Sequence, residues 1–371
     1  MKAAVLRRAG EPMTVEEVEL LPPGPGEVRV EVAAVGVCRS DWHVMTGATR
    51  HPLPAVCGHE GSGIVGAVGE GVTTVAAGDH VVLSWAPSCG DCYYCRHDLP
   101  AQCEAYIEAV WNGTLRDGTT RLQSGGRPLY HYAALACFAQ ACVVPASCCV
   151  RIPREAPLEA AALLGCAVAT GVGAALRRAR VAPGSSAAVF GCGGVGMNII
   201  QGARIAGASL IAAVDVNPAR LDLARRLGAT HAVDASRGDP VAAVRSFTGG
   251  RGADHTFEAL GSPAVMQQAI EAARRGGTIV LVGLGGHDED IRLGAGTFTR
   301  SDKVLTSAYY GGCDPHRDMP EMMAMAMRGE LQLEPLVGRR RPLEEIGEAF
   351  EDLRRGDVLR TLITFPAVSR S

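Results

Sequence analysis

The sequence has no apolar stretch long enough to cross a membrane, because Gly, Pro or a charged residue interrupts each of its longest apolar runs. It also has no apolar core near its first residues: residues 1–6 are followed by Arg7 and Arg8, where a signal peptide would continue with apolar residues. We therefore expect a cytoplasmic protein with no membrane partner.

A strong excess of charge of one sign is absent as well. The chain has 36 Lys and Arg residues against 39 Asp and Glu, a formal net charge of -3, so we expect no nucleic-acid partner. Low-complexity tracts and repeats of fixed period are also missing. With 371 residues, 47% hydrophobic and 20% charged, the chain fits a packed globular protein of two domains.

The pattern of predicted secondary structure changes near residue 167. Before that point, short β segments such as 27–32 and 79–83 are separated by Gly and Pro, which predicts a mostly antiparallel, barrel-like domain. Beyond it, apolar strands at 186–190, 210–214 and 278–282 alternate with helical patterns, and 218–227 reads as a helix with Asn217 as its N-cap. This alternation is typical of a doubly wound parallel sheet.

A glycine-rich motif, G-x-G-x-x-G, follows the predicted strand 186–190. Since 46 glycines produce accidental matches, the motif is informative only through its context: a strand precedes it, a helix follows, and Asp215 ends the next strand. Glycines let the backbone approach a pyrophosphate, and a carboxylate accepts hydrogen bonds from ribose while repelling a 2′-phosphate. The motif therefore predicts NAD rather than NADP; the alternative is a tight turn that binds nothing. The predicted residues are Gly191, Gly193, Gly194, Val195, Gly196, Asp215 and Arg220.

Thirteen cysteines are many for a chain without an export signal, and metal ligation or buried free thiols are more plausible than disulfides. Four of them, Cys89, Cys92, Cys95 and Cys103, fall within one short loop. Four thiolates suit a tetrahedral zinc ion and leave no vacant position, which predicts a structural zinc site. Free or disulfide-bonded cysteines are the alternative. Three further candidates, Cys38, His59 and Cys166, are too dispersed for spacing alone to join them.

Several strings share the order and separations of one enzyme family: GVCRSD at 36–41, GHEGSGIV at 58–65, VGEGV at 68–72, the four-cysteine loop, LGC at 164–166, VFGCGGVG at 189–196 and VD at 214–215. On these strings the chain resembles the zinc-dependent alcohol dehydrogenases of the medium-chain dehydrogenase/reductase family, with the liver-type and glutathione-dependent classes especially similar. The resemblance implies an α/β protein. It has a GroES-like, mostly-β catalytic domain at 1–167 and 310–371 and a Rossmann cofactor domain at 168–309.

The resemblance also implies roles for the dispersed residues. Cys38, His59 and Cys166 would hold a catalytic zinc ion, the second of two per chain, with Asp41 fixing the His59 imidazole and Glu60 just behind the metal. Ser40 would take the alcohol proton and His43 would release it to solvent. Arg39 and Arg360 match positions that contact the cofactor pyrophosphate; the alternative for each is a solvated surface charge.

The implied activity is NAD-linked oxidation of an alcohol to an aldehyde or ketone, or the reverse. The glutathione-dependent enzymes carry an acidic residue near Thr49 and an arginine near Ile107, and the absence of both argues against glutathione as co-substrate. The matching substrate channel is aromatic with polar tips, which favours a primary alcohol with an aromatic or extended apolar group. Its residues would be Ser40, Thr49, Trp85, Tyr132, Ala133, Leu284 and Tyr309.

Three alternatives remain at this stage. The chain could be a formaldehyde dehydrogenase that uses a thiol other than glutathione, or a nicotinoprotein that retains its NAD through turnover. The four-cysteine loop could instead belong to a zinc-ribbon module that binds nucleic acid, which the missing basic patch disfavours. Besides a small-molecule alcohol or aldehyde, we expect a second copy of the chain as partner, in a dimer or tetramer.

Overall fold

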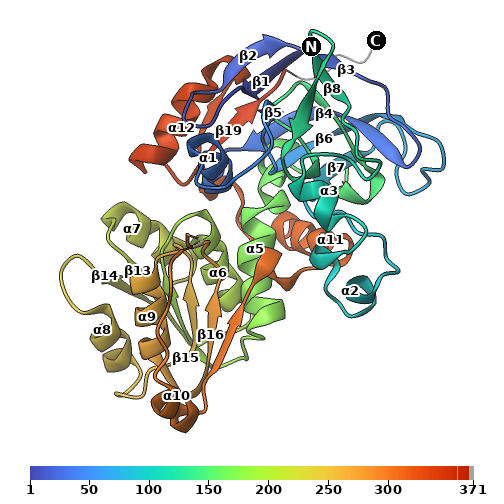
Figure 1. The fold of residues 1–371 in the computed structure, drawn as a ribbon. Helices are drawn as coiled ribbons and strands as arrows, with labels where there is room; N and C mark the ends of the chain where they lie inside the picture. The colour runs from blue at the N-terminus through green and yellow to red at the C-terminus, as the bar shows by residue number, and fades with distance from the viewer. Residues whose placement is uncertain (287, 357, 367–371) are drawn as a thin grey trace. The chain divides into compact units, whose positions relative to one another are not determined.

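The computed structural model describes residues 1–286, 288–356 and 358–366. Contacts within the chain divide it into two compact units (Figure 1). The first, here called the barrel unit, comprises Met1–Cys166, Asp314–Gly329 and Leu333–Ser371. The second, the parallel-sheet unit, comprises Ala167–Cys313 and Glu330–Gln332.

Two mixed sheets form the barrel unit, and most of their strand pairs are antiparallel, as the sequence predicts. One sheet has the order β2-β1-β5-β9-β8-β3. Its strands are β1 Lys2–Leu6, β2 Thr14–Glu17, β3 Glu19–Leu20, β5 Ala55–Val56, β8 Leu122–Ser124 and β9 Arg127–His131. The other has the order β11-β7-β6-β4-β19-β18, with β10 also paired to β4. Its strands are β4 Glu27–Gly36, β6 Gly61–Val68, β7 His80–Leu83, β10 Ala141–Pro145, β11 Cys149–Ile152, β18 Val337–Arg341 and β19 Arg360–Thr364.

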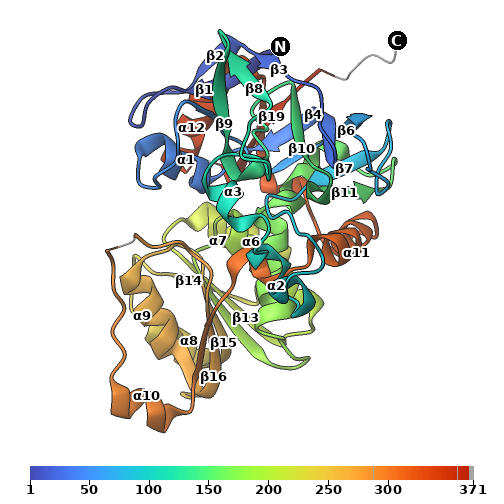
Figure 2. The same cartoon turned by 45° about the vertical axis from the view of Figure 1, so that its right-hand side comes forward.

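Short helices join these strands and cover their edges. They are α1 Arg39–Thr46, α2 Tyr93–Arg96, α3 Ile107–Trp111, α4 Leu158–Ala161, α11 Pro315–Met327 and α12 Ile346–Arg355. Helix α12 lies against β19 and α11 lies against β11 (Figures 1 and 2). The core is made of fully buried side chains such as Leu6, Leu83, Leu129 and Phe138, so the strands that carry the candidate site residues rest on a packed interior.

All neighbouring strands of the parallel-sheet unit run parallel, in the order β14-β13-β12-β15-β16-β17. The strands are β12 Ser186–Phe190, β13 Leu210–Asp215, β14 His231–Asp234, β15 Ala253–Glu258, β16 Ala273–Leu281 and β17 Val304–Ser307. Counted from β12, this order is 3-2-1-4-5-6, the order of a Rossmann fold, in which ligands bind beyond the carboxyl ends of the strands where the order reverses. Here the reversal falls between β12 and β15.

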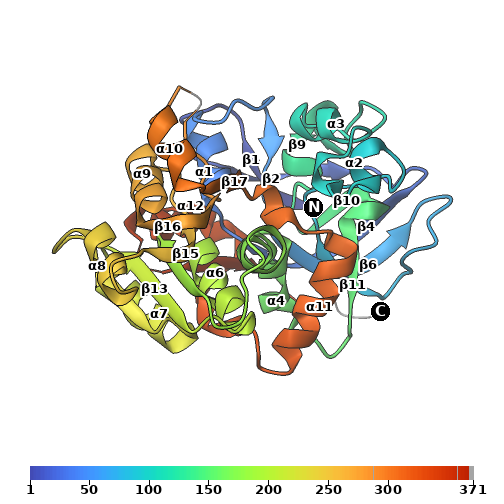
Figure 3. The ribbon, with the colours of Figure 1, turned by 90° about the horizontal axis from the view of Figure 1, so that it is seen from below.

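Helices cover both faces of this sheet. They are α5 Ala167–Gly173, α6 Gly194–Ile205, α7 Pro218–Leu227, α8 Pro240–Phe247, α9 Pro263–Ala272 and α10 Ala295–Ser301. Figure 3 shows the strands between α6 and α7 on one side and α8 and α9 on the other. Helix α7 has the predicted bounds: the Asn217 side chain accepts hydrogen bonds from the N–H groups of Ala219 and Arg220, and Gly228 is the C-cap.

Within the part of the chain that the structure describes, no single helix is long and apolar enough to span a membrane; the bent pair Leu158–Gly165 and Ala167–Arg178 meets the length and composition criteria only when taken together.

Candidate active site and dinucleotide site

Three potential metal ligands from distant parts of the sequence meet in the barrel unit. Cys38 precedes α1, His59 precedes β6, and Cys166 follows the 3-10 turn Ala162–Gly165. Their ligand atoms lie within 4.8 Å of one another, and all three residues are buried. Gly165 leaves no room for a side chain, because a Cβ there would lie 2.7 Å from the Leu83 carbonyl oxygen.

The buried carboxylate of Asp41 organises this cluster. Its Oδ1 accepts hydrogen bonds from His59 Nδ1 at 3.1 Å and from the Gly58 N–H at 2.9 Å, while its Oδ2 accepts from the Cys38 N–H at 3.3 Å. With Nδ1 donating to Asp41, the second ring nitrogen of His59 is left as the metal-binding atom. Burial lowers the pKa of His59, but the Asp41 carboxylate outweighs it and raises that pKa well above its usual value.

The charges around Cys38 favour its thiolate, the form that binds metal. A hydrogen bond from Cys166, followed by the nearby guanidinium of Arg360, holds the pKa of Cys38 well below its usual range despite burial. Arg360 Nη2 lies 3.7 Å from Cys38 Sγ, and its Nε lies 3.4 Å from Glu60 Oε2. Two sulfurs and one imidazole nitrogen at these separations fit three corners of a zinc tetrahedron and leave the fourth for a substrate oxygen.

The four clustered cysteines form a second set. The Sγ atoms of Cys89, Cys92, Cys95 and Cys103 lie within 4.8 Å of one another, and the Cys92 and Cys103 sulfurs are 3.8 Å apart. Zinc–sulfur bonds of about 2.3 Å in a tetrahedron place sulfurs about 3.8 Å apart, so the spacing fits a Zn(Cys)₄ site. Backbone N–H groups, above all that of Cys95, lower the pKa of Cys92 to about 6. No disulfide joins any of the thirteen cysteines, all of which lie in the part of the chain that the structure describes.

Of the predicted substrate and proton-transfer residues of the barrel unit, Ser40 and Tyr132 lie next to the three-ligand cluster. Ser40 Oγ is 3.9 Å from Cys38 Sγ, and the Tyr132 ring lies edge-on to His59 with centroids 5.4 Å apart. Ala133 adopts a left-handed φ of 55° directly after Tyr132. His43, Thr49 and Trp85 are partly buried, and Arg39 is exposed.

The glycine motif of the parallel-sheet unit has the geometry of a phosphate-binding turn. A Cβ on Gly196 would lie 1.8 Å from the Gly191 carbonyl oxygen, whereas one on Gly193 would meet no atom within 4 Å. The close contact at position 196 requires glycine, so that α6 can start against β12. The lack of neighbouring atoms at Gly193 leaves open space beside the N-terminus of α6. Gly194 is the first residue of α6, and Val195 follows it.

Asp215 ties this turn to the end of β13. Its Oδ2 accepts from the Cys192 N–H at 2.7 Å, its Oδ1 accepts from the Asn217 N–H at 2.9 Å, and Arg220 Nη1 lies 3.9 Å from Oδ2. The next residue, Val216, is 64% exposed, and Leu260 beyond β15 is 59% exposed. No local sequence pattern indicates these two apolar side chains, because their strands flank β12 only in the folded sheet.

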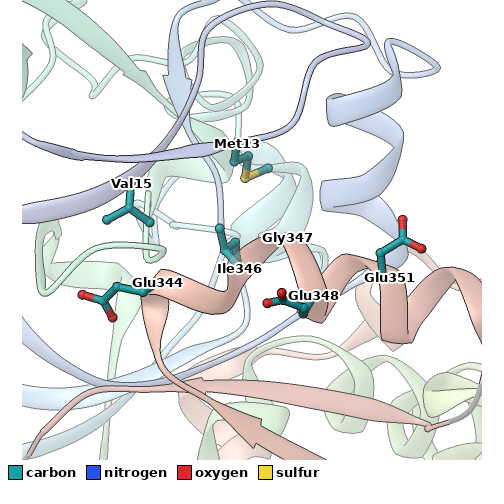
Figure 4. A pocket seen from close by; sticks show the side chains of 7 residues that line it. All are labelled: Met13, Val15, Glu344, Ile346, Gly347, Glu348 and Glu351. Carbon is teal, nitrogen blue, oxygen red and sulfur yellow. The ribbon is translucent and has the colours of Figure 1, made fainter.

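The two remaining predicted substrate residues also belong to the parallel-sheet unit. Leu284 is exposed, whereas Tyr309 is partly buried, which raises its pKa to about 12. A separate hollow in the barrel unit is lined by Met13, Val15 and five residues within 344–351 (Figure 4). Two of its three acidic residues, Glu344 and Glu351, are paired with Lys2 and Arg354, and it contains none of the predicted site residues.

A Rossmann sheet with a glycine-rich turn, joined in one chain to two zinc-type ligand sets, defines the class of metal-dependent dehydrogenases. Comparison with known families agrees: the alcohol dehydrogenase GroES-like domain matches residues 24–154, and the zinc-binding dehydrogenase domain matches residues 194–328. The chain belongs to the zinc-dependent alcohol dehydrogenases of the medium-chain dehydrogenase/reductase family. The fold class expected from the sequence, a GroES-like domain with a Rossmann domain, is confirmed.

Individual relatives cover almost the whole chain. The S-(hydroxymethyl)glutathione dehydrogenase of Escherichia coli O139:H28 is 40% identical over 98% of this chain and 99% of its own length. Among solved structures, an alcohol dehydrogenase zinc-binding domain protein from Burkholderia ambifaria is 38% identical, covers 98% of both chains and has a TM-score of 0.95. Benzyl alcohol dehydrogenase from Acinetobacter calcoaceticus is 32% identical, covers 98% of this chain and 99% of its own, and has a TM-score of 0.93.

We expect the two ligand sets to respond differently to loss of a cysteine. Cys103→Ala removes one of four ligands from the closed set; it should lower the zinc content from two to one per chain and reduce the melting temperature, because structural zinc binding is coupled to folding. Cys166→Ala should also leave one zinc but abolish turnover with little change in melting temperature. Metal analysis, calorimetry and an NADH assay measure the three quantities.

The matched control is Cys149→Ala, which removes a buried thiol that belongs to neither set. It should retain both zinc ions. A Cys103→Ala protein that is stable but inactive, together with a Cys166→Ala protein that unfolds, would mean that the two sites have been exchanged in our assignment.

Proposed function

We propose that this enzyme oxidises an alcohol to its aldehyde or ketone, or catalyses the reverse, at the cluster of Cys38, His59 and Cys166 with NAD as hydride acceptor. The observation that carries the proposal is the convergence of these three buried ligand atoms within 4.8 Å, backed by Asp41. Zinc held there supplies Lewis-acid polarisation of the substrate oxygen. Residues 1–167 and 310–371 would form the catalytic domain and 168–309 the cofactor domain; the two compact units support this division.

The chain's own residues would move the alcohol proton. The Ser40 hydroxyl lies beside Cys38, with its oxygen 3.9 Å from the Cys38 sulfur, and would accept the proton first. His43 is on the next turn of α1 and is partly buried; burial, followed by the charge of Arg39, lowers its pKa below the usual value. His43 is therefore neutral at pH 7 and able to accept a proton and release it to water. Glu60 would act electrostatically through Arg360.

The cofactor would bind on the parallel-sheet unit. The open space at Gly193 and the N-terminus of α6 suit a pyrophosphate, and Asp215 suits the hydroxyls of an adenosine ribose. Val216 and Leu260 follow the strands on either side of β12, so they offer exposed apolar surfaces to an adenine ring. Arg39, Arg220 and Arg360 are the proposed cationic contacts to the dinucleotide.

For the substrate, we propose a primary alcohol with an aromatic or extended apolar group. The Tyr132 ring beside His59 and the indole of Trp85 supply aromatic surface in the barrel unit. Ala133, Thr49, Leu284 and Tyr309 are the other proposed wall residues. The likeness to benzyl alcohol dehydrogenase supports an aromatic substrate.

A second candidate is a thiol-dependent formaldehyde dehydrogenase whose carrier is not glutathione. It is favoured by the 40% identity to S-(hydroxymethyl)glutathione dehydrogenase, while Thr49 and Ile107 replace the acidic and basic residues of the glutathione-dependent class. A nicotinoprotein that retains NAD is a further variant of the first proposal. We also propose a cytoplasmic homo-oligomer; the exposed Val304 on the edge strand β17 supports self-association.

The deciding experiment is a substrate panel assayed by NADH absorbance. We expect benzylic and long-chain primary alcohols to exceed ethanol in kcat/KM by about tenfold or more, since each added apolar group contributes ~1–3 kcal/mol in an apolar pocket. Formaldehyde should be oxidised no faster when glutathione is added. Oxidation of formaldehyde only in the presence of another thiol would favour the second candidate, and cofactor that persists through desalting would identify a nicotinoprotein.

Asp215→Ser should relax the choice of cofactor. Removing the carboxylate removes its repulsion of a 2′-phosphate, so the ratio of kcat/KM for NAD to that for NADP should fall by about tenfold or more. The control is Asp222→Ser, which changes an exposed carboxylate paired with Arg225 on α7. Equal use of NAD and NADP by the unaltered enzyme would contradict the role given to Asp215.

His43→Ala should slow alcohol oxidation near pH 7 by about 10²-fold or less, since a general base typically contributes ~10²–10⁴-fold and water replaces part of a relay. Because burial lowers the pKa of His43, the defect should extend to lower pH than for a histidine with the usual pKa. It should shrink at alkaline pH, where hydroxide accepts the proton directly. Zinc content and NAD affinity should not change. The measurement is the pH profile of kcat/KM, with His316→Ala as control; superimposable profiles would rule His43 out of the relay.

A further inference from the structure

The turn after β15 is held by a single buried glutamate. Glu258, the last residue of β15, has no exposed surface, and its Oε1 accepts hydrogen bonds from the N–H groups of Leu260 at 2.8 Å, Gly261 at 2.8 Å and Ser262 at 3.3 Å. One carboxylate oxygen thus satisfies three consecutive main-chain donors. The backbone conformation of the turn depends on this oxygen.

The second carboxylate oxygen is enclosed rather than solvated. Oε2 of Glu258 is buried without a hydrogen-bond partner among the described residues, and a Cβ on Gly283 would lie 2.7 Å from it. Burial raises the pKa of Glu258, and the main-chain N–H groups oppose this effect. Burying a carboxylate in such surroundings costs free energy, and an apolar residue would pack there more favourably. The carboxylate is therefore explained by the turn, whose conformation its hydrogen bonds maintain.

The turn places Leu260 beside the glycine motif. The Ala259 N–H donates to the Phe190 carbonyl at 2.9 Å, and a Cβ on Gly191 would lie 1.9 Å from Leu260 Cδ1. Leu260 nevertheless keeps 59% of its surface exposed, at the reversal of strand order where a Rossmann sheet binds its ligand. Leu260 therefore has exposed apolar surface next to the glycine motif, where the proposed dinucleotide would bind.

We propose that Glu258 is a positioning residue for the cofactor: it fixes the turn at 260–262 so that Leu260 forms one apolar wall of the adenosine site. The inference rests on the proposed use of NAD. Glu258 does not touch the dinucleotide itself and acts through the main chain of the turn and the Leu260 side chain.

A double-mutant cycle tests this route, with the dissociation constant of NADH measured by fluorescence and that of AMP by calorimetry. Glu258→Ala and Leu260→Ala should each weaken both ligands by about tenfold, and the double variant should be no more than about twofold weaker than either single variant. Non-additive effects would show that Glu258 acts on the cofactor through Leu260. A general loss of stability would not produce non-additivity. Glu258→Gln keeps an acceptor oxygen and should bind within about threefold of the unaltered enzyme.

Glu271→Ala is the matched control, because it removes an exposed glutamate from α9 of the same unit. Should Glu258→Ala not fold, Glu258→Asp takes its place in the cycle, since its shorter carboxylate cannot reach the three donors. If the unaltered enzyme fails to bind NADH, the proposed cofactor is wrong, and the role of Glu258 with it. If it binds NADH but the Glu258 and Leu260 effects add, or Glu258→Ala binds normally, only the positioning role is wrong.

Discussion

A single buried carboxylate, that of Asp41, is the interaction on which the three-ligand cluster depends. It joins the start of α1 to the turn before β6 by binding the Cys38 N–H, the Gly58 N–H and His59 Nδ1 together. A buried anion without partners would be strongly destabilising, and these three donors offset that cost. The same bonds place two of the three ligands and select the imidazole tautomer that can bind a metal. Cys166, the last residue of the first segment of the barrel unit, then completes the set.

The two ligand sets differ in their position in the sequence, their burial and the number of ligands that they supply. The four-cysteine set comes from one short loop, contains exposed as well as buried sulfurs, and supplies every corner of a tetrahedron. The other set is buried, comes from three distant segments and supplies only three corners. It is also bordered by two ionisable neighbours: the charge of Arg360 favours the Cys38 thiolate, and Glu60 pairs with Arg360. An open fourth position and nearby charges suit a reaction, and these features support the proposed catalytic role of the three-ligand set.

A feature could be predicted from the sequence when the residues that define it lie close together in the chain. The helix at 218–227 carries its own cap in Asn217, and the four-cysteine loop carries all its ligands within one segment, so both could be predicted from spacing. Cys38, His59 and Cys166 could be joined only through the family resemblance, because strand pairing brings them together. Val216, Glu258 and Leu260 were missed for the same reason: no local pattern indicates that β13 and β15 flank β12.

The parallel-sheet unit, like the region around Asp41, contains carboxylates that accept hydrogen bonds from several main-chain N–H groups. Asp215 binds the N–H groups of Cys192 and Asn217, and Glu258 binds those of the turn at 260–262. In each case a buried or nearly buried carboxylate takes up main-chain donors of a turn at the carboxyl edge of the sheet, where no ladder partner exists for them. Such turns gain a fixed shape without filling the space in front of them. An apolar side chain that stabilised the same turns by packing would occupy that space. Hydrogen bonds from the main chain to buried carboxylates instead fix each turn and leave the proposed binding surface open.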